Sequence, residues 1–214
     1  MEFIWIVLLI ILVLISYWIF QKDKRKVSGI LTSLAAERSG SVKHVFGSYP
    51  QLSFQYQGTD ILVSSMVGGS GSGGASSSHT FAHFYDSSFP EKLYFKIQSK
   101  SMETVVKQSL DFHRIRINDS SMDKAFFIQA KHEHFIRELL TPEIQRGTME
   151  LSDGQGLEAR FLTVKFFDGN AWVEKPRFDI RIPKVSTEYR EYEQLIALTL
   201  LFHEQISMLR KRWA

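Results

Sequence analysis

A glycine and serine run, residues 67–80, is the first stretch whose residue types could do chemistry. It reads "VGGSGSGGASSSHT" and places Gly69, Gly71 and Gly74 in the spacing G-x-G-x-x-G. A dinucleotide site needs a helix directly after that spacing, because the helix N-terminus faces the pyrophosphate. The residues that follow are strand-like, and the chain has no Gly-Lys pair. We therefore predict neither a phosphate cradle nor a domain linker, but a flexible loop at 68–78 between two strands.

The histidines are the next candidates, as metal ligands. His132 and His134 form the only tight cluster, but side chains two apart on a helix face different directions. A zinc protease pattern needs its second histidine four residues after the first, where Ile136 stands. His79 and His83 have that spacing, but in a strand it separates them by about 13 Å. We predict solvated or capping histidines and no metal site.

Nucleophilic catalysis has no recognisable motif. Ser76 to Ser78 precede His79, but there is no G-x-S-x-G elbow, and the chain has no cysteine. Asp123, Asp153 and Asp168 each suit a turn. Paired carboxylates meet through folding rather than through spacing, so acid–base catalysis stays open. The sequence identifies no catalytic or cofactor-binding residue.

The sequence predicts one globular domain and an N-terminal apolar segment. The 214 residues are 44% hydrophobic and 23% charged, which suits one well-buried domain. The apolar segment is the uncharged stretch of 18 residues from Phe3 to Phe20, which covers about 27 Å as a helix. Trp5, Tyr17 and Trp18 lie near its ends, where aromatic rings favour the two membrane interfaces. We predict a transmembrane anchor at residues 1–21.

A cleaved signal peptide is the alternative for this stretch. It requires a basic start and small residues at a cleavage site, whereas the chain starts Met1-Glu2 and the stretch ends in bulky residues. Lys22, Lys24, Arg25 and Lys26 follow it directly. They predict a single-pass protein of the cell membrane with its N-terminus outside and its C-terminal domain in the cytoplasm. Their role is a stop-transfer flank or, alternatively, attraction to anionic lipid.

The sequence pI of about 9.0 does not indicate nucleic acid binding. Residues 22–26 carry a net charge of +3, and Arg210, Lys211 and Arg212 carry another +3. The rest of the domain has 19 basic and 21 acidic residues, a net charge of −2. Such a domain offers no basic face for a phosphate backbone.

The remaining pattern predicts an α+β domain over residues 41–214, after a basic flank and a short juxtamembrane helix at 22–40. Strand-like runs and short turns imply a largely antiparallel sheet with packed helices. Strands are predicted at 42–46, 52–56, 60–65, 80–85, 93–98, 112–117, 126–130, 148–151, 157–167, 171–173 and 178–184. Helices are predicted at 27–38, 102–110, 132–140 and 187–212, with another turn opening at Pro142.

The long C-terminal helix is strongly apolar on one side. Its apolar positions recur at spacings of three and four: Tyr192, Leu195, Ile196, Thr199, Phe202, Ile206 and Leu209. Leu198, Leu200 and Leu201 widen that side. We expect this helix to cover the sheet, and a protein partner or a second copy of the chain could use its remaining surface.

Residues 123–146, "DKAFFIQAKHEHFIRELLTPEIQR", combine an Asp-x-x-Phe strand with a helix that contains Leu139-Leu140. In this respect the chain resembles a family of bacterial and archaeal membrane-anchored α+β proteins of unknown function. The resemblance extends over residues 30–210 and is most specific at 123–140. It implies the fold and the N-terminal anchor, and it implies no activity or cofactor.

Three functions are therefore compared. The first is a membrane-anchored cytosolic domain that binds a protein or a lipid surface without catalysis. The second is a small-molecule sensor whose glycine and serine loop closes over its ligand. The third is a membrane-tethered enzyme, which would bring together two buried carboxylates, or a histidine and an aspartate. We expect the first.

Overall fold

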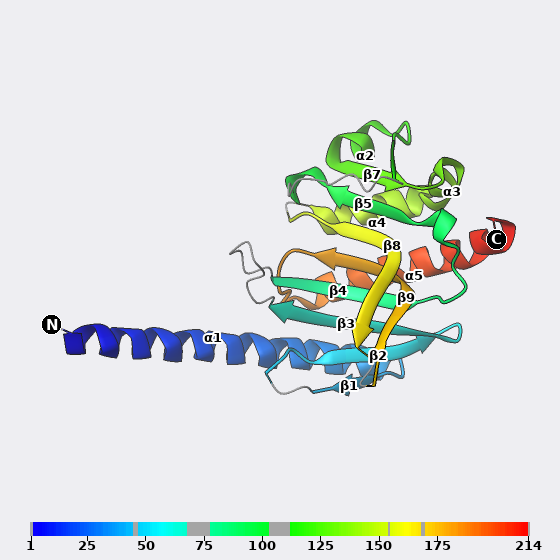
Figure 1. Cartoon of the computed structure of the whole chain (residues 1–214). Coiled ribbons are helices and arrows are strands. Elements are labelled where there is room, and N and C mark those ends of the chain that lie inside the picture. The colour runs from blue at the N-terminus through cyan, green and yellow to red at the C-terminus, as the bar shows by residue number, and fades with distance from the viewer. Residues whose placement is uncertain are drawn as a thin grey trace.

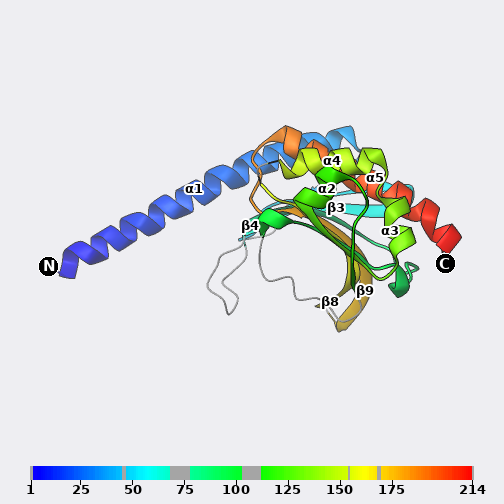
Figure 2. The ribbon, with the colours of Figure 1, turned by 90° about the horizontal axis from the view of Figure 1, so that it is seen from above.

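The computed structural model confirms an α+β protein with one long N-terminal helix and one antiparallel sheet (Figure 1). It describes residues 2–44, 47–67, 78–102, 112–153, 155–167 and 170–213. Helices lie on one side of the sheet and the long helix extends far beyond the domain (Figure 2). The predicted loop at 68–78, except for its last residue, and most of the predicted helix at 102–110 lie outside the described residues.

Helix α1 (Glu2–Glu37) contains the apolar stretch and also part of the domain. Its first half is exposed, and among the described residues it is the one helix long and apolar enough to cross a membrane. Its second half packs on the domain through Val27, Leu31 and Leu34, which share one helix face and are fully buried. The helix predicted at 27–38 is therefore present over residues 27–37, but it continues α1 and is not a separate element.

The nine strands form one sheet in the order β1-β2-β3-β4-β9-β8-β5-β7-β6, and all its pairings are antiparallel. The strands are β1 Ser41–Lys43, β2 Gln51–Tyr56, β3 Thr59–Val67, β4 Ser78–Tyr85, β5 Phe95–Ser99, β6 His113–Ile115, β7 Phe126–Ala130, β8 Glu158–Phe167 and β9 Trp172–Ile182. The centre of the sheet, β4-β9-β8-β5, joins the two halves of the chain.

Four further α-helices pack around this sheet: α2 Ser120–Ala125, α3 Glu133–Leu139, α4 Pro142–Ser152 and α5 Tyr189–Trp213. Two short 3-10 helices, η1 Glu91–Leu93 and η2 Lys100–Met102, flank β5. Helix α5 confirms the predicted C-terminal helix, and all seven predicted positions at its centre are buried. Asp119 caps α2 by accepting from the backbone N–H groups of Ser121 and Met122, a helix that the sequence analysis did not predict.

The hydrophobic core lies between the sheet and the helices. Alternate side chains of the central strands point toward α5, and four of their rings pack closely with one another and with Phe202 of α5: Phe84, Phe95, Phe161 and Phe178. The ring centroids of Phe178 lie 5.0 Å from those of both Phe84 and Phe202. This face of the sheet accounts for most of the apolar burial of the domain.

One strand prediction is wrong, and two others are parts of a single longer strand. Residues 148–151 belong to α4, where Thr141 caps the helix and Pro142 occupies its first turn. Residues 171–173 and 178–184 belong to one strand, β9, which continues through Pro176. Proline has no backbone N–H to donate to a neighbouring strand. It is tolerated at 176 because β4 ends opposite Arg177, so no β4 residue is paired with Pro176.

Candidate functional site: a charged face opposite the core

The other face of the sheet carries the polar side chains, and no described helix covers it (Figure 2). Cross-strand pairing aligns Lys96, Arg160, Asp179 and His83 in one row across β5, β8, β9 and β4. The next row includes Gln98, Glu158, Arg181 and Phe81. Directly opposed residues lie on the same face of a sheet, so these residues share one surface, the open face.

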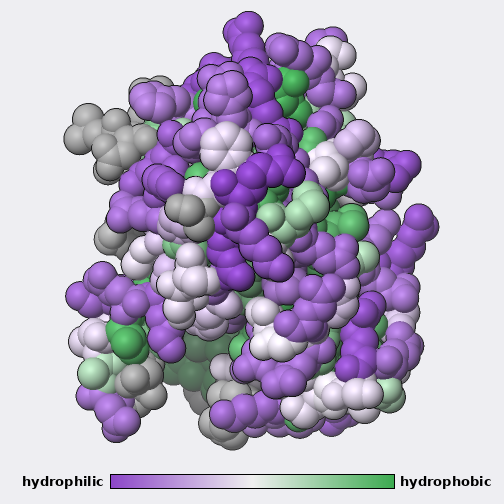
Figure 3. Space-filling view, turned by 90° about the vertical axis from the view of Figure 1, so that its right-hand side faces the viewer, coloured by the Kyte–Doolittle hydropathy of each residue, from purple (hydrophilic) through white to green (hydrophobic). Residues whose placement is uncertain are grey.

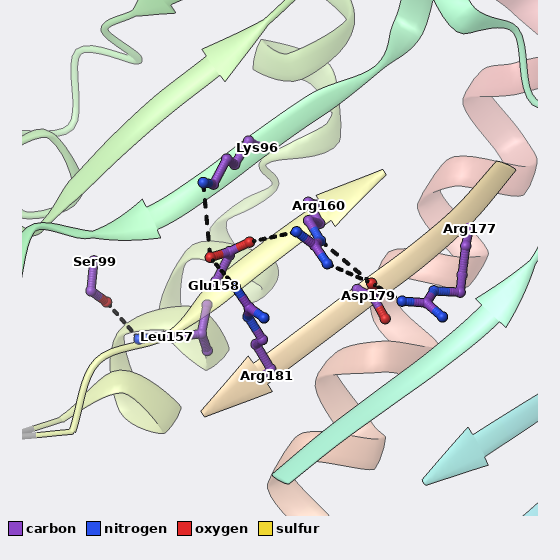
Figure 4. Close-up of polar contacts among 8 residues, drawn as sticks. All are labelled: Lys96, Ser99, Leu157, Glu158, Arg160, Arg177, Asp179 and Arg181. Atoms are coloured by element: carbon purple, nitrogen blue, oxygen red, sulfur yellow. Dashed lines mark hydrogen bonds and ion pairs between the residues drawn. The ribbon is translucent and has the colours of Figure 1, made fainter. Parts of the chain in front are cut away.

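Six charged residues form a connected set on the open face, which we call the charge cluster: Lys96, Glu158, Arg160, Arg177, Asp179 and Arg181 (Figure 4). Glu158 contacts Arg181 at 2.8 Å, Arg160 at 3.3 Å and Lys96 at 3.9 Å. Asp179 contacts Arg177 at 2.6 Å and Arg160 at 3.3 Å. Arg160 therefore bridges the two carboxylates.

The cations of the charge cluster lie over its carboxylates. The side chains of Glu158 and Asp179 are 2% and 8% exposed, whereas those of the four cations are 22% to 31% exposed. Long basic side chains cover buried groups with their stems and keep their charged ends at the surface. Four cations against two carboxylates leave a net charge of +2, so the cluster presents a cationic surface to solvent. The prediction of no basic face is wrong here, because a near-neutral total charge does not exclude a local excess of cations.

Some donors of this surface have no partner among the described residues. The buried Nε atoms of Arg177 and Arg181 make no hydrogen bond there. Burial lowers the pKa of Lys96, and the charge of Glu158 opposes that effect. A buried N–H group without a partner costs free energy, which an acceptor atom supplied by a ligand would recover.

His83 lies beside the charge cluster on β4, directly opposite Asp179. The residue is 7% exposed, and its Nδ1 atom has no hydrogen-bond partner in the described part of the chain. Burial and the nearby charge of Arg177 lower the pKa of His83 to about 4, against the opposite influence of Asp179. The imidazole is therefore neutral at pH 7 and adds polarity without charge.

Four rings follow one another along the open face of β4: His79, Phe81, His83 and Tyr85, the aromatic column. Neighbouring centroids lie 5.7, 5.6 and 5.5 Å apart, and the Phe81 and His83 rings are stacked at 7°. Alternation along a strand produces this column, because every second side chain points to the same face.

The outer ends of β8 and β9, residues 162–167 and 172–177, form a two-stranded hairpin arm. Tyr85 is opposite Arg177, and Arg177 is opposite Leu162. Phe166 lies four residues beyond Leu162, so a flat sheet would hold its ring more than about 13 Å from that of Tyr85. The two centroids are 5.4 Å apart, which shows that the arm bends over the open face.

The bent arm and the open face enclose a trough. The arm passes in front of the sheet in Figure 1, and that side of the molecule is the left side of Figure 3. Figure 3 shows a hollow at the lower left, between a projecting lobe and the rest of the domain. Apolar side chains of the arm and the aromatic column thus lie next to the charge cluster.

The geometry favours binding over acid–base chemistry. Glu158 and Asp179 are the buried carboxylates that an enzyme would need, and His83 is next to Asp179. Arginine side chains pair with both carboxylates, however, and cover them from solvent. The exposed groups are cations, whose chemistry is to attract and orient an anion.

The residues predicted at the membrane lie together at the middle of α1. Lys22, Lys24, Arg25 and Lys26 follow the apolar stretch, and the Lys22 Nζ atom lies 5.5 Å from the centre of the Trp18 ring. Trp18, Lys22, Arg25 and Lys26 line a groove on the exposed side of the helix. Trp5 and Tyr17 are 71% and 61% exposed on the bare part of α1. These positions are those expected of residues at a membrane interface.

The prediction of solvated or capping histidines is confirmed for His132 and wrong for His83, which is buried on β4 at 7% exposure. His132 caps α3, because its Nδ1 atom accepts a hydrogen bond from the Phe135 backbone N–H at 3.2 Å. His79 and His83 lie on one strand face with the Phe81 ring between them. Within the described ranges, no three His, Asp or Glu side chains are placed to hold a metal ion together.

Helix α5 leaves one described groove along α4. Its lining includes Gly147 of α4 and Ala197, Leu198 and Leu201 of α5. Most of the apolar side of α5 is used in the core. Binding of a protein partner or a second copy through this helix stays a prediction.

Comparisons with known proteins found no match among family models, curated proteins or solved structures. The family resemblance at residues 123–146 therefore stays a prediction. In the structure this segment forms the end of α2, strand β7 and helices α3 and α4.

The sequence analysis missed the charge cluster and the aromatic column. Alternating patterns were the available signal: "EARFL" places Glu158 and Arg160 on one side of a strand, and "RFDIR" does the same for Arg177, Asp179 and Arg181. A charged outer face is usual for an antiparallel sheet, so the pattern alone did not mark a site.

Proposed function

We propose that this protein is a single-pass membrane protein whose cytoplasmic domain binds an anionic ligand on the open face, without catalysis. One observation carries the proposal: four cations of the charge cluster lie over two buried carboxylates, and two arginine Nε–H groups beneath the surface have no described partner. Such a surface attracts an anion and offers directed donors to its oxygen atoms.

The location is proposed from the sequence of α1. Its apolar half is followed at once by Lys22, Lys24, Arg25 and Lys26, and the bias of basic residues favours retention of that side in the cytoplasm. In intact cells, protease added outside is expected to leave the domain uncut. Digestion of the domain in sealed cells would reverse the proposed orientation.

Anion binding can be tested with the full chain in a neutral detergent and inorganic phosphate as the probe. Phosphate is expected to raise the thermal midpoint of the native protein, since a ligand that binds only the folded state stabilises it. Arg181→Gln removes one surface cation and leaves Glu158 with Arg160 and Lys96. We expect it to weaken phosphate binding about tenfold, the loss of one charge-assisted hydrogen bond.

Two variants make this test specific. Glu158→Gln removes a negative charge from the same place and is expected to strengthen phosphate binding. Lys165→Gln, which removes a 61% exposed cation from the outer part of β8, is the control and should leave binding unchanged. Equal phosphate binding by all four proteins would contradict a site on the open face.

A further inference from the structure

We propose that the domain makes a second contact with the membrane, through the exposed apolar residues at the end of β3. Met66 and Val67 form this surface, which we call the rim. The partner of the rim is the interfacial region of the bilayer that holds α1. The inference rests on the membrane location in the proposed function, and it goes further because it specifies which edge of the domain meets the lipid.

Exposed apolar side chains are concentrated at the rim. Met66 and Val67 are 46% and 51% exposed. Outside α1, the described part of the chain exposes only two other large hydrophobic side chains, Trp172 on the hairpin arm and Met208 on α5. Consecutive residues of a strand point to opposite faces of the sheet, so the rim is apolar on both faces. A single helix could cover only one of them, whereas lipid can surround the end of a strand.

The rim lies level with the end of the apolar stretch. Phe20 is the last residue of that stretch, and its ring packs edge-on against Tyr49 with centroids 5.3 Å apart. Tyr49 lies two residues before Gln51, which pairs with Ser64 of β3 in the antiparallel register. Met66 lies two residues after Ser64, so the same register places Met66 level with Tyr49. Tyr49 therefore relates the rim to the point where α1 leaves its apolar half.

The domain has a fixed orientation relative to the apolar stretch. Helix α1 is unbroken from Glu2 to Glu37 and enters the core through Val27 and Leu31. In Figure 1, β3 ends on the side from which the apolar half of α1 projects, and in Figure 2, β4 begins on that side. A bilayer around the apolar half would meet this side of the domain first.

The interfacial region is the part of the bilayer that suits the rim. Trp18 ends the apolar stretch with an interfacial aromatic ring, and Lys22 and Arg25 follow with charges that favour the headgroup level. Apolar side chains at that depth leave water for the boundary between headgroups and acyl chains. The domain is then attached at two points, α1 and the rim, and the second attachment resists tilting of the domain against the bilayer.

Fluorescence quenching by lipid tests this contact in the full chain. Because the chain has no cysteine, Met66→Cys and Val67→Cys each provide one site for the environment-sensitive fluorophore NBD. The labelled proteins are placed in phosphatidylcholine nanodiscs that contain a lipid with a nitroxide on its headgroup. We expect quenching about threefold stronger than at control positions, because the interface holds the label within reach of the headgroup nitroxide. The emission should also shift to the blue, since lipid excludes water from the fluorophore.

The controls are the other two exposed apolar positions. Trp172→Cys and Met208→Cys replace side chains that are 67% and 51% exposed. Trp172 begins β9, whose other end at Ile182 pairs with β4 near the rim. Met208 follows His203, whose ring contacts Thr59 at the opposite end of β3 from the rim. Labels at both positions should emit as in water and show weak quenching.

A second pair of variants tests whether apolar character drives the contact. In the Met66→Cys protein, Val67→Glu adds a charge to the rim, and we expect it to reduce quenching of the label about threefold. Val67→Leu keeps the rim apolar and should leave quenching unchanged. The thermal midpoint of both variants in detergent should match that of the natural chain, because position 67 is exposed.

The outcomes separate this inference from the proposed membrane location. Leu12→Cys, at the middle of the apolar stretch, should be quenched by a nitroxide deep in the acyl chain. If Leu12→Cys is quenched and the rim labels behave like the controls, the rim does not meet the membrane and only this inference is overturned. Equal quenching at the rim, position 172 and position 208 would also overturn it, because the contact would not be confined to one edge. If the label at position 12 is not quenched, the membrane location is overturned together with the rim contact.

Discussion

Each face of the sheet contains fully buried residues, but different side chains cover them. On the helix side, Phe84, Phe161 and Phe178 are excluded from water by α5 and by one another. On the open face, Glu158 and Asp179 are 2% and 6% exposed without any described helix above them. Arginine and lysine side chains cover them instead. A sheet face can thus be closed by helices or by a layer of ion pairs.

The two faces differ in their capacity to bind a ligand. Apolar packing between sheet and helices is dense and non-directional. It leaves neither space nor polar groups with which a ligand could interact. An ion-pair layer is held by directional contacts and keeps its cations at the surface. The core face therefore sustains the fold, and the open face is the one that can exchange partners.

Phe178→Ala should have the largest effect, because it removes a fully buried ring between Phe84 and Phe202. We expect a loss of about 3 to 5 kcal/mol in the free energy of unfolding. Urea unfolding of the full chain in detergent, followed by near-ultraviolet circular dichroism, measures it. Phe81→Ala, on the opposite face of the neighbouring strand, should cost about 1 kcal/mol. Similar losses for the two would contradict the contrast between the faces.

His83 should make the open face sensitive to acid. Burial and Arg177 lower its pKa to about 4 in the folded state, below the ordinary value of 6.5. The unfolded chain therefore binds the proton first, and stability that is present above pH 6.5 is lost as the pH falls toward 4. The contribution of this group is on the order of 3 kcal/mol.

His83→Gln is the matching variant, because glutamine does not titrate. Unfolding free energies measured at pH 7.5 and pH 4.5 should differ less in this variant than in the natural chain. Since other groups titrate in both proteins, only the difference between the two pH profiles reports His83. Parallel profiles would show that the imidazole is accessible to protons in the folded state.

Asp179→Asn tests the ion-pair layer itself. The carboxylate holds Arg177 at 2.6 Å and Arg160 at 3.3 Å, and the amide cannot neutralise either guanidinium. We expect a loss of about 2 kcal/mol in the free energy of unfolding, typical of hydrogen bonds to charged groups. The same urea titration measures it. An unchanged or increased stability would mean that the layer does not contribute to closing this face.

Glu174→Gln should have the smallest effect. Glu174 pairs with Lys165 at 3.8 Å on the hairpin arm, and both side chains are 61% exposed. Solvent screens such a pair, so the change in unfolding free energy should stay within about 0.5 kcal/mol. A loss as large as that of Asp179→Asn would show that exposure does not distinguish the two ion pairs.

Much of the fold could be predicted because local pattern determines it. Strand β7 agrees with its prediction at 126–130, and β2, β4 and β8 agree to within one or two residues. Residues 148–151 were misassigned because their apolar side chains fit a strand as well as the end of a helix capped at Thr141. Short apolar runs carry little information on period, whereas the repeat of α5 extends over 25 residues.

The candidate site could not be predicted in the same way. Lys96, Glu158 and Asp179 come from three strands, and only the sheet order β5-β8-β9 makes them neighbours. The approach of Phe166 to Tyr85 depends on the bend of a hairpin whose strands look ordinary in sequence. Neither feature has a local signature.

Sequence alone predicts the apolar stretch with its basic flank, the α+β class and the apolar side of α5. These features depend on the pattern of residues a few positions apart and on how those residues interact with water or lipid. They do not depend on the rest of the fold. The tertiary structure decided which face of the sheet the helices cover, which charges meet and where the hairpin arm bends. Those outcomes depend on contacts between residues far apart in the chain, whose geometry exists only after the strands have paired.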